Sequence, residues 1–121
     1  MSKPPEIVTY VLRVSTSSIY NAGTSANVFV QIFGKHGRKL WTTKFPLIGG
    51  RLKQRPDRTE VYEIDECDVG ELTKLRISHD GKAGWHLKRV VVEKLGEAWL
   101  FKCGRWIHEG EHLDLNATHD E

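Results

Sequence analysis

The alternation of apolar and polar side chains recurs along this chain and predicts β-strands. In the stretch NVFVQIF, Val28, Val30 and Ile32 fall on one face, because successive side chains of a strand point to opposite sides. The stretch ELTKLRISH repeats the pattern, with Leu75 and Ile77 on one side. No segment of useful length shows the period of an amphipathic helix. The pattern therefore predicts a protein built from short strands.

Clusters of Gly, Asn, Asp and Ser separate these stretches and indicate the turns between strands. The expected strands cover residues 7–14, 27–33, 38–45, 60–64, 71–79, 85–95 and 97–103. Residues 46–59 contain two Pro and two Gly and are expected to form a long irregular connection. Roughly seven or eight short strands separated by turns are typical of an antiparallel β-sandwich. We therefore predict an all-β fold of this class.

The length of 121 residues favours a single domain. We expect this domain at residues 7–113, with tails at residues 1–6 and 114–121. The first residues, MSKPPEIVTY, lack the apolar core of a signal peptide, so the expected location is intracellular, in the cytoplasm. Cys67 and Cys103 are too few for a disulfide framework. Two free thiols fit a reducing compartment, although the sequence leaves a single bridge between them open.

The formal net charge of +2 does not indicate binding to nucleic acid. The positive charge is concentrated in residues 35–58, which carry eight Lys or Arg and one Asp. Such a segment suits an anionic partner, either a lipid surface or an acidic peptide. The exposed cations of a solvated loop give the same pattern, so both interpretations stay open.

Two apolar residues, Leu40 and Trp41, follow two cations, Arg38 and Lys39, inside this basic segment. An aromatic ring surrounded by cations suits a membrane interface, where the ring enters the headgroup layer and the cations meet anionic lipid. The alternative is a Trp41 side chain packed beneath the long connection. We predict that these residues contact a membrane surface or a protein partner.

Residues 108–112 spell HEGEH and match the zinc-protease motif H-E-x-x-H. That motif requires a helix, because a helix places both histidines on one face, one turn apart. Here Gly104 precedes the motif and Gly110 interrupts it, and glycine inside a helix costs about 1 kcal/mol. We therefore predict a polar turn after a strand and no enzymatic activity, with a zinc peptidase as a remote alternative.

The loop NAGTSAN offers a candidate site for a cation. Asn21, Thr24, Ser25 and Asn27 provide side-chain oxygens there. Asp80, in the turn SHDGKAG, adds a carboxylate if the two loops meet at one end of the sandwich. Calcium takes six to eight oxygen ligands, usually with carboxylates among them, whereas an ordinary Asx or Ser/Thr turn needs none. The residues alone leave both interpretations open.

Three stretches carry a family resemblance: GTSANV, the HDG turn and AGWHLKRVVVE, in this order. They are similar to the motifs G-T-x-A-x-V, H-D-N-x-G and A-x-W-x-L of the PLAT domain, the polycystin–lipoxygenase–α-toxin or lipoxygenase-homology domain. The resemblance extends over residues 7–108 and is nearest to tandem-PLAT and polycystin-type members.

The resemblance implies a β-sandwich of two four-stranded sheets. It also implies a noncatalytic, monomeric module that targets its host to a membrane or to partner proteins, peripheral to the membrane and without nucleic acid. The alternative function is a protein–protein scaffold domain of a larger tandem-repeat protein, without lipid binding.

Some members of the family bind calcium between the loops at one end. The resemblance places a first calcium loop at Asn21, Gly23, Thr24 and Ser25, and an opposing loop at Asp80. Ser25 stands where the family often has Asp, and the loop after HDG is shorter than usual. Calcium is therefore the one possible cofactor that we expect.

Overall fold

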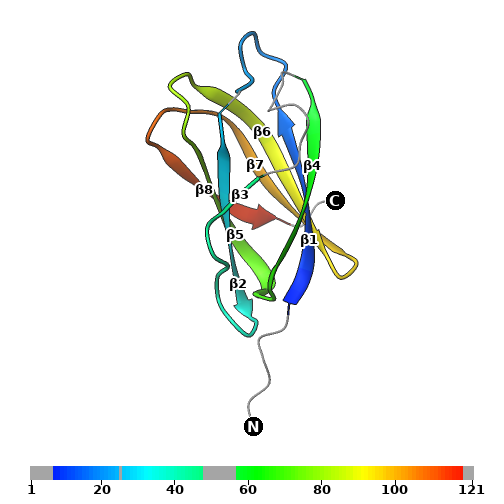
Figure 1. The fold of residues 1–121 in the computed structure, drawn as a ribbon. Coiled ribbons are helices and arrows are strands. Elements are labelled where there is room, and N and C mark those ends of the chain that lie inside the picture. Colours follow the sequence, from blue (N-terminus) through cyan, green and yellow to red (C-terminus); the bar gives the residue numbers. More distant parts are fainter. Residues whose placement is uncertain (1–6, 25, 48–56, 119–121) are drawn as a thin grey trace.

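The computed structural model describes residues 7–24, 26–47 and 57–118, which form an antiparallel all-β fold without a helix (Figure 1). The strands in these ranges are β1 Ile7–Thr16, β2 Val28–His36, β3 Phe45–Pro46, β4 Thr59–Cys67, β5 Gly70–His79, β6 Trp85–Lys94, β7 Glu97–Ile107 and β8 His112–Thr118. The predicted all-β antiparallel class is therefore confirmed.

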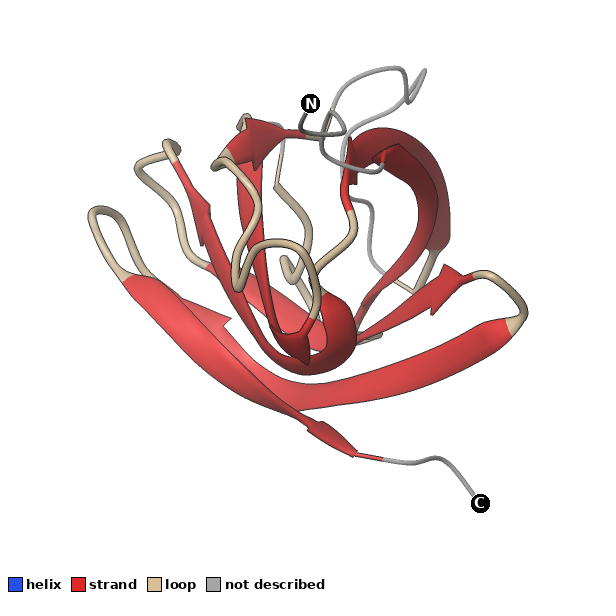
Figure 2. Ribbon diagram, turned by 90° about the horizontal axis from the view of Figure 1, so that it is seen from below, coloured by secondary structure: helices blue, strands red, loops and turns tan. Residues whose placement is uncertain are grey.

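The eight strands of the described residues form one hydrogen-bonded sheet, in the order β3-β2-β5-β8-β7-β6-β1-β4. The sheet curls over, so that its two halves face each other (Figure 2). Within the described ranges, β7 and β8 pair at two positions, Leu100 with Thr118 and Phe101 with Ala117. The predicted pair of separate four-stranded sheets is therefore corrected to one continuous, curled sheet, because the end of β8 reaches β7.

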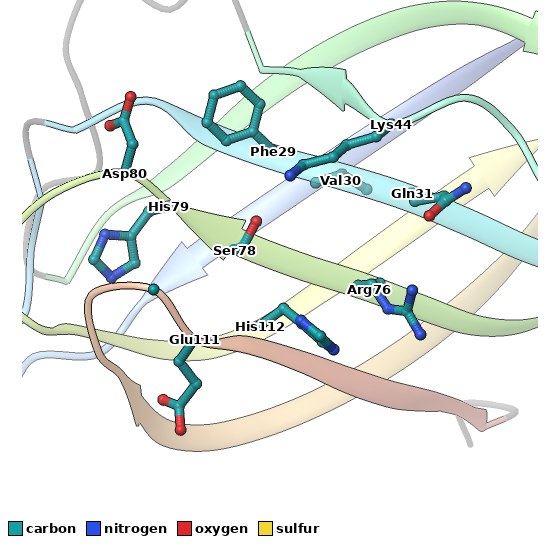
Figure 3. A pocket seen from close by; sticks show the side chains of 11 residues that line it. Phe29, Val30, Gln31, Lys44, Arg76, Ser78, His79, Asp80, Glu111 and His112 are labelled. Carbon is teal, nitrogen blue, oxygen red and sulfur yellow. The ribbon is translucent and has the colours of Figure 1, made fainter.

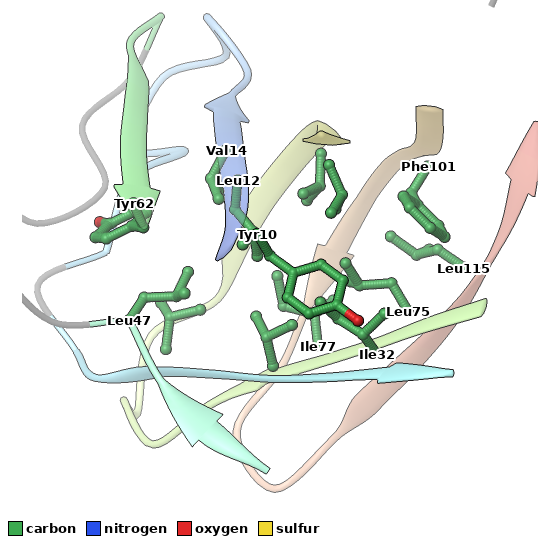
Figure 4. Close-up of a cluster of buried hydrophobic side chains, with 14 of the residues drawn as sticks. Tyr10, Leu12, Val14, Ile32, Leu47, Tyr62, Leu75, Ile77, Phe101 and Leu115 are labelled. Carbon is green, nitrogen blue, oxygen red and sulfur yellow. The ribbon is translucent and has the colours of Figure 1, made fainter. Parts of the chain in front are cut away.

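Hydrophobic side chains from both halves fill the space inside the curl (Figure 4). Val30, Ile32, Leu75 and Ile77 are completely buried, as the alternation predicts. Each fully buried aliphatic side chain stabilises the fold by about 1.5–3 kcal/mol. A slip of one residue in β2 or β5 would turn these side chains to solvent, so the alternation fixes the register of both strands.

β2 connects two opposite ends of the molecule (Figure 1). The upper end holds the loop before β2 and the turn between β5 and β6, and the lower end holds residues 37–44 and the turns before β5 and after β6. β2 has nine residues, and at the rise of a strand this length separates the ends by about 30 Å.

The predicted strand at residues 38–45 is wrong over most of its length. Only β3, Phe45–Pro46, is a strand there. A side chain interrupts the ladder, because Ile32 N donates its hydrogen bond to Thr42 Oγ1 at 3.1 Å. Residues 38–44 therefore form a loop that is anchored to β2 without extending the sheet.

The predicted C-terminal tail at residues 114–121 begins inside β8, which continues to Thr118. Leu113 and Leu115 both point into the core and are 8% and 7% exposed, so the alternation continues past the expected domain boundary. The predictions that lie outside the described residues concern the N-terminal tail, the chain end and part of the long connection, at residues 1–6, 119–121 and 48–56.

Candidate functional site

The residues predicted to contact a membrane or a partner lie together on the loop that follows β2, at the lower end. Arg38 and Lys39 are exposed. Leu40 and Trp41 are 53% and 55% exposed, so Trp41 is not packed beneath the long connection. Large apolar side chains are usually buried in soluble proteins, and two adjacent exposed ones mark this loop as a candidate contact surface.

Backbone hydrogen bonds hold this loop in place. Gly34 N donates to the Leu40 carbonyl at 2.8 Å, and Arg38 N donates to the Asp68 carbonyl at 3.2 Å. Trp41 also forms an isolated bridge with β2. The loop therefore presents its exposed side chains from a fixed backbone, and a partner need not order it on binding.

Glycine allows the close backbone packing beneath the loop. A Cβ atom on Gly37 would lie 2.2 Å from the carbonyl carbon of Val69. Gly70, in the turn that packs against Gly37, has a φ of +79°, a conformation that side chains disfavour. A larger residue at either position would push the loop away from the turn before β5.

A buried ion pair joins the turn before β5 to the end of β6. Lys94 is 6% exposed, and its Nζ donates to Asp68 Oδ1 at 2.7 Å and to the Gly70 carbonyl. Burial disfavours the charged form of Asp68, but the hydrogen bonds from Lys94 and from Gly70 N hold its pKa below the ordinary value. The ion pair thereby fixes the turn to which the Arg38 backbone is bonded.

Five other large apolar side chains of the described residues are exposed, and they were not among the predicted contact residues. Ile7 and Val61, on β1 and β4, are 61% and 53% exposed. Leu95, in the β6–β7 turn at the lower end, is 73% exposed. Ile19 and Tyr20, in the loop before β2 at the upper end, are 47% and 87% exposed. Leu95 precedes Gly96 between two predicted strands, and a glycine in that position marks a turn. The exposure of Leu95 could therefore have been predicted from the sequence.

Three of the residues predicted for a calcium site meet at the upper end. Gly23, Thr24 and Asp80 line one depression. Asn21 is exposed and is not among the lining residues, and Ser25 lies outside the described residues. The expected meeting of the two loops is therefore observed, whereas the complete ligand set is not assembled among the described residues.

Asp80 is held by Asn27. Asn27 N and Nδ2 donate to its two carboxylate oxygens at 2.8 and 2.9 Å, and Asp80 N donates to the Asn27 carbonyl at 3.1 Å. These hydrogen bonds keep the pKa of Asp80 below its ordinary value. Lys82 lines the same depression. Calcium affinity depends on the number of carboxylates, and one carboxylate beside an ammonium group does not fit a tight calcium site.

The histidine of the HDG turn is structural. His79 is 4% exposed, and its Nδ1 accepts a hydrogen bond from Gly81 N at 3.1 Å. The proton therefore lies on Nε2, which donates to the Ile107 carbonyl at 2.7 Å. The ring also contacts Trp85 edge to face, with centroids 6.2 Å apart. His79 thus ties the turn after β5 to the end of β7.

The HEGEH stretch forms the turn between β7 and β8. Glu111 N donates to the His108 carbonyl at 3.1 Å, and His108 N donates to Glu111 Oε1 at 2.9 Å. Gly110 has a φ of +76°. The predicted polar turn is therefore confirmed. Within the described ranges, no cluster of three or more His, Cys, Asp or Glu side chains is arranged to hold a metal ion.

The two cysteines are free thiols, which decides between the possibilities that the sequence left open. Cys67 Sγ lies 3.7 Å from the Trp41 carbonyl, to which it donates a weak hydrogen bond. Burial raises the pKa of the Cys103 thiol, so a reactive thiolate is not favoured at that position.

The curled antiparallel sheet, with the HDG turn and the loop before β2 at its upper end, defines a small all-β module. The family model of the PLAT/LH2 domain matches residues 10–117, and the chain belongs to this family. Human lipoxygenase homology domain-containing protein 1 is 36% identical over 112 residues, which cover 88% of this chain and 5% of that protein. The mouse polycystin family receptor for egg jelly is 31% identical over 121 residues, which cover 95% of this chain and 6% of that protein.

Solved structures show the same fold. Coral 8R-lipoxygenase, whose crystal structure is described in terms of calcium activation via a C2-like domain, superposes with a TM-score of 0.79 at 23% identity, over 90% of this chain and 17% of that chain. The PLAT resemblance of the three motifs is therefore confirmed. The chain spans 5–6% of the curated relatives it matches. In the part of the chain that the structure describes, no helix is long and apolar enough to cross a membrane.

Proposed function

We propose that this chain is a noncatalytic module that attaches its host protein to an anionic membrane surface. The observation that carries the proposal is the exposed pair Leu40 and Trp41, flanked by the exposed Arg38 and Lys39. Family membership supports a targeting role, since residues 10–117 match the PLAT/LH2 domain.

The proposed attachment is interfacial. Trp41 and Leu40 enter the headgroup layer, and because each is about half exposed, each gains about 1 kcal/mol on leaving water. Arg38 and Lys39 each gain about 1 kcal/mol near anionic lipid. A total of about 4 kcal/mol corresponds to weak, reversible binding. Half of this energy is electrostatic, so salt weakens the attachment.

The proposed attachment does not require calcium. The depression that contains Asp80 lies at the upper end. Asp80 is bonded to Asn27 and Trp41 is the bridge partner of Phe33, so the rise of a strand separates the two sites by about 20 Å. The described donors of the depression do not fit a tight calcium site. Calcium chelation should therefore leave vesicle binding unchanged, and the amide NMR signals of residues 21–27 and 79–82 should not shift at micromolar calcium.

The proposed location is the cytoplasmic face of a membrane, with peripheral attachment. Anionic lipids give that face a negative surface potential, to which a basic loop is attracted. The free thiols Cys67 and Cys103 agree with a reducing compartment.

Vesicle binding and tryptophan fluorescence test the proposal together. Trp85 and Trp99 are 0% and 3% exposed and Trp106 is partly buried, so the part of a lipid-dependent fluorescence change that Trp41→Ala removes reports on Trp41. We expect a blue shift with vesicles that contain about 30% phosphatidylserine, and little change with neutral vesicles. Trp41→Ala should abolish the shift and reduce co-sedimentation by about fivefold, which is the loss of about 1 kcal/mol.

Tyr20→Ala is the matched control, because it removes an exposed aromatic ring at the opposite end. It should leave vesicle binding unchanged. Equal binding to neutral and anionic vesicles, or equal losses for Trp41→Ala and Tyr20→Ala, would refute the proposed surface. Absence of binding to any vesicle would favour the alternative function, a scaffold domain that contacts protein only.

A further inference from the structure

A basic, aromatic face lies on the outer side of β2 and β5 and adjoins the loop at residues 38–44, which contributes Lys44. It consists of outward side chains that alternate with the buried ones: Phe29, Phe33, Lys44, Lys74 and Arg76. Figure 3 shows Phe29, Lys44 and Arg76 from this set around a groove of about 360 Å³. We call this set the basic face.

The cations of the basic face lie over its aromatic rings. Lys44 Nζ is 5.2 Å from the centroid of Phe29, and Lys74 Nζ is 4.3 Å from that of Phe33. Asp114 pairs with Arg76 at 2.7 Å and with Lys74 at 3.6 Å.

Asp80 and Glu111 also line the groove, where Asp80 accepts a hydrogen bond from Asn27 N and Glu111 accepts one from His108 N. Among the described ion pairs, Asp114 is the one carboxylate bound to the basic face, so positive charge is concentrated at Lys44, Lys74 and Arg76. The contact with Asp114 also shows that a carboxylate fits between Lys74 and Arg76.

An acidic row lies on the outer side of β4, at the other edge of the sheet. Val61, Glu63 and Asp65 are exposed and alternate with the inward Tyr62. We call these three outward residues the acidic row. Among the described residues, no cation pairs with Glu63 or Asp65. Charged side chains on an edge strand can also serve to prevent pairing with a strand of another molecule. That role alone would not require a complementary surface elsewhere on the chain.

The two surfaces match in spacing as well as in charge. Glu63 and Asp65 are two positions apart on β4, and Lys74 and Arg76 are two positions apart on β5, so both pairs repeat at about 7 Å. Val61, 53% exposed, comes two positions before Glu63. The matching position on β5 is Ser78, which pairs with Phe29. In an antiparallel alignment of the two strands, Glu63 and Asp65 would face Arg76 and Lys74, and Val61 would face Ser78 beside Phe29.

We propose that the acidic row of one copy of this chain binds the basic face of a second copy. The contact is heterologous, since it joins two different surfaces, and repeated contacts of this kind build a head-to-tail array. A weak contact suffices between domains joined by a short linker, because their effective concentration is about millimolar. The interface includes Lys44 from the loop at residues 38–44, but none of Arg38, Lys39, Leu40 and Trp41, which are the residues proposed to contact the membrane.

Concentration-dependent NMR of the purified chain tests this interface. In about 50 mM salt, amide signals of β2, β4, β5 and β8 should shift between about 0.05 and 1 mM protein. Salt at about 500 mM should weaken the association at least tenfold, because it screens exposed charges. The absence of shifts up to about 1 mM protein would overturn the proposal.

Charge exchange provides the decisive comparison. Lys44→Glu/Lys74→Glu and Glu63→Lys/Asp65→Lys should each weaken self-association at least tenfold, because like charges then face each other. An equimolar mixture of the two variants should restore association, since the reversed surfaces complement each other. Association that survives both reversals, or a mixture that remains monomeric, would overturn the proposal.

Matched controls separate this interface from general charge effects and from lipid binding. Glu97→Lys/Lys102→Glu exchanges charges at exposed positions elsewhere and should leave the association unchanged. The neutral variant Lys44→Gln/Lys74→Gln keeps the test valid if the reversed variant folds poorly. If this neutral variant loses binding to anionic vesicles while self-association persists, the membrane is the occupant of the basic face and the proposal is wrong.

Discussion

Replacing Lys94 by Met removes the cation of the buried ion pair and keeps most of its packing volume. The side chains of Lys94 and Asp68 are 5% and 16% exposed, so Asp68 is left charged with little access to water. Removal of one partner from a buried pair costs about 3–5 kcal/mol. Gly70 N still donates to Asp68 at 2.8 Å, and we therefore expect the lower value, about 3 kcal/mol.

Urea unfolding at pH 7, followed by tryptophan fluorescence, measures this loss. With a slope of about 2 kcal/mol per molar urea, the midpoint should fall by about 1.5 M. The matched control is Glu93→Gln, which breaks the Arg13–Glu93 pair, whose side chains are each 41% exposed. It should cost less than about 1 kcal/mol. Equal losses for the two variants would refute the claim that burial makes the Lys94 pair strong.

The pH dependence of stability shows whether the charged form of Asp68 stabilises the folded chain. The pKa of Asp68 is lower in the folded chain than its ordinary value of 3.8. Its charge therefore adds stability above pH 3.8, and this stability is lost as the pH falls through the folded-state pKa. The double variant Lys94→Met/Asp68→Asn lacks this contribution. At pH 7 it should be more stable than Lys94→Met alone by about 1–3 kcal/mol, and no recovery would contradict the pairing.

Three further variants or conditions test local features. His79→Leu removes two hydrogen bonds to backbone groups and should cost about 2–4 kcal/mol in urea unfolding; a loss below about 0.5 kcal/mol would contradict its structural role. Gly37→Ala forces a Cβ against the turn before β5 and should lower the free energy of unfolding by about 1–3 kcal/mol. Thermal unfolding measures this loss, and an unchanged Tm would contradict the close packing. Acidification through the lowered pKa of Asp80 should break its contacts with Asn27, so the Asn27 amide signal should titrate with a midpoint below 3.8; a midpoint above that value would contradict the contacts.

The alternation of apolar and polar residues predicts strands that have one face in the core and the other in solvent. Val30 and Ile77 follow the two-residue period and are completely buried. Lys94 is in phase with the buried Val92 on the same strand, so the period also placed its side chain inward. Its partner Asp68 lies 26 residues away in sequence, and a local pattern contains no information on pairing at that distance.

The sequence anticipated parts of the candidate site through motifs. The family pattern implied that Asp80 lies near the loop before β2, and the structure places it there. It did not reveal that Asn27 already holds both carboxylate oxygens, because that depends on the relative position of two loops. The strand expected at residues 38–45 failed for a similar reason, since Thr42 accepts a ladder hydrogen bond through its side chain.

The fold places its candidate surfaces along β2. The exposed Trp41 forms an isolated bridge with Phe33, so the loop proposed to meet the membrane adjoins the basic face, whereas the depression with Asp80 lies near the other end of the strand. Packed cores deform little, so a substitution acts mainly on the surface that it touches. Leu40 is exposed and does not belong to the basic face. Leu40→Ala should therefore weaken vesicle binding and leave self-association intact, and a loss of both activities in this variant would show that the two surfaces are coupled.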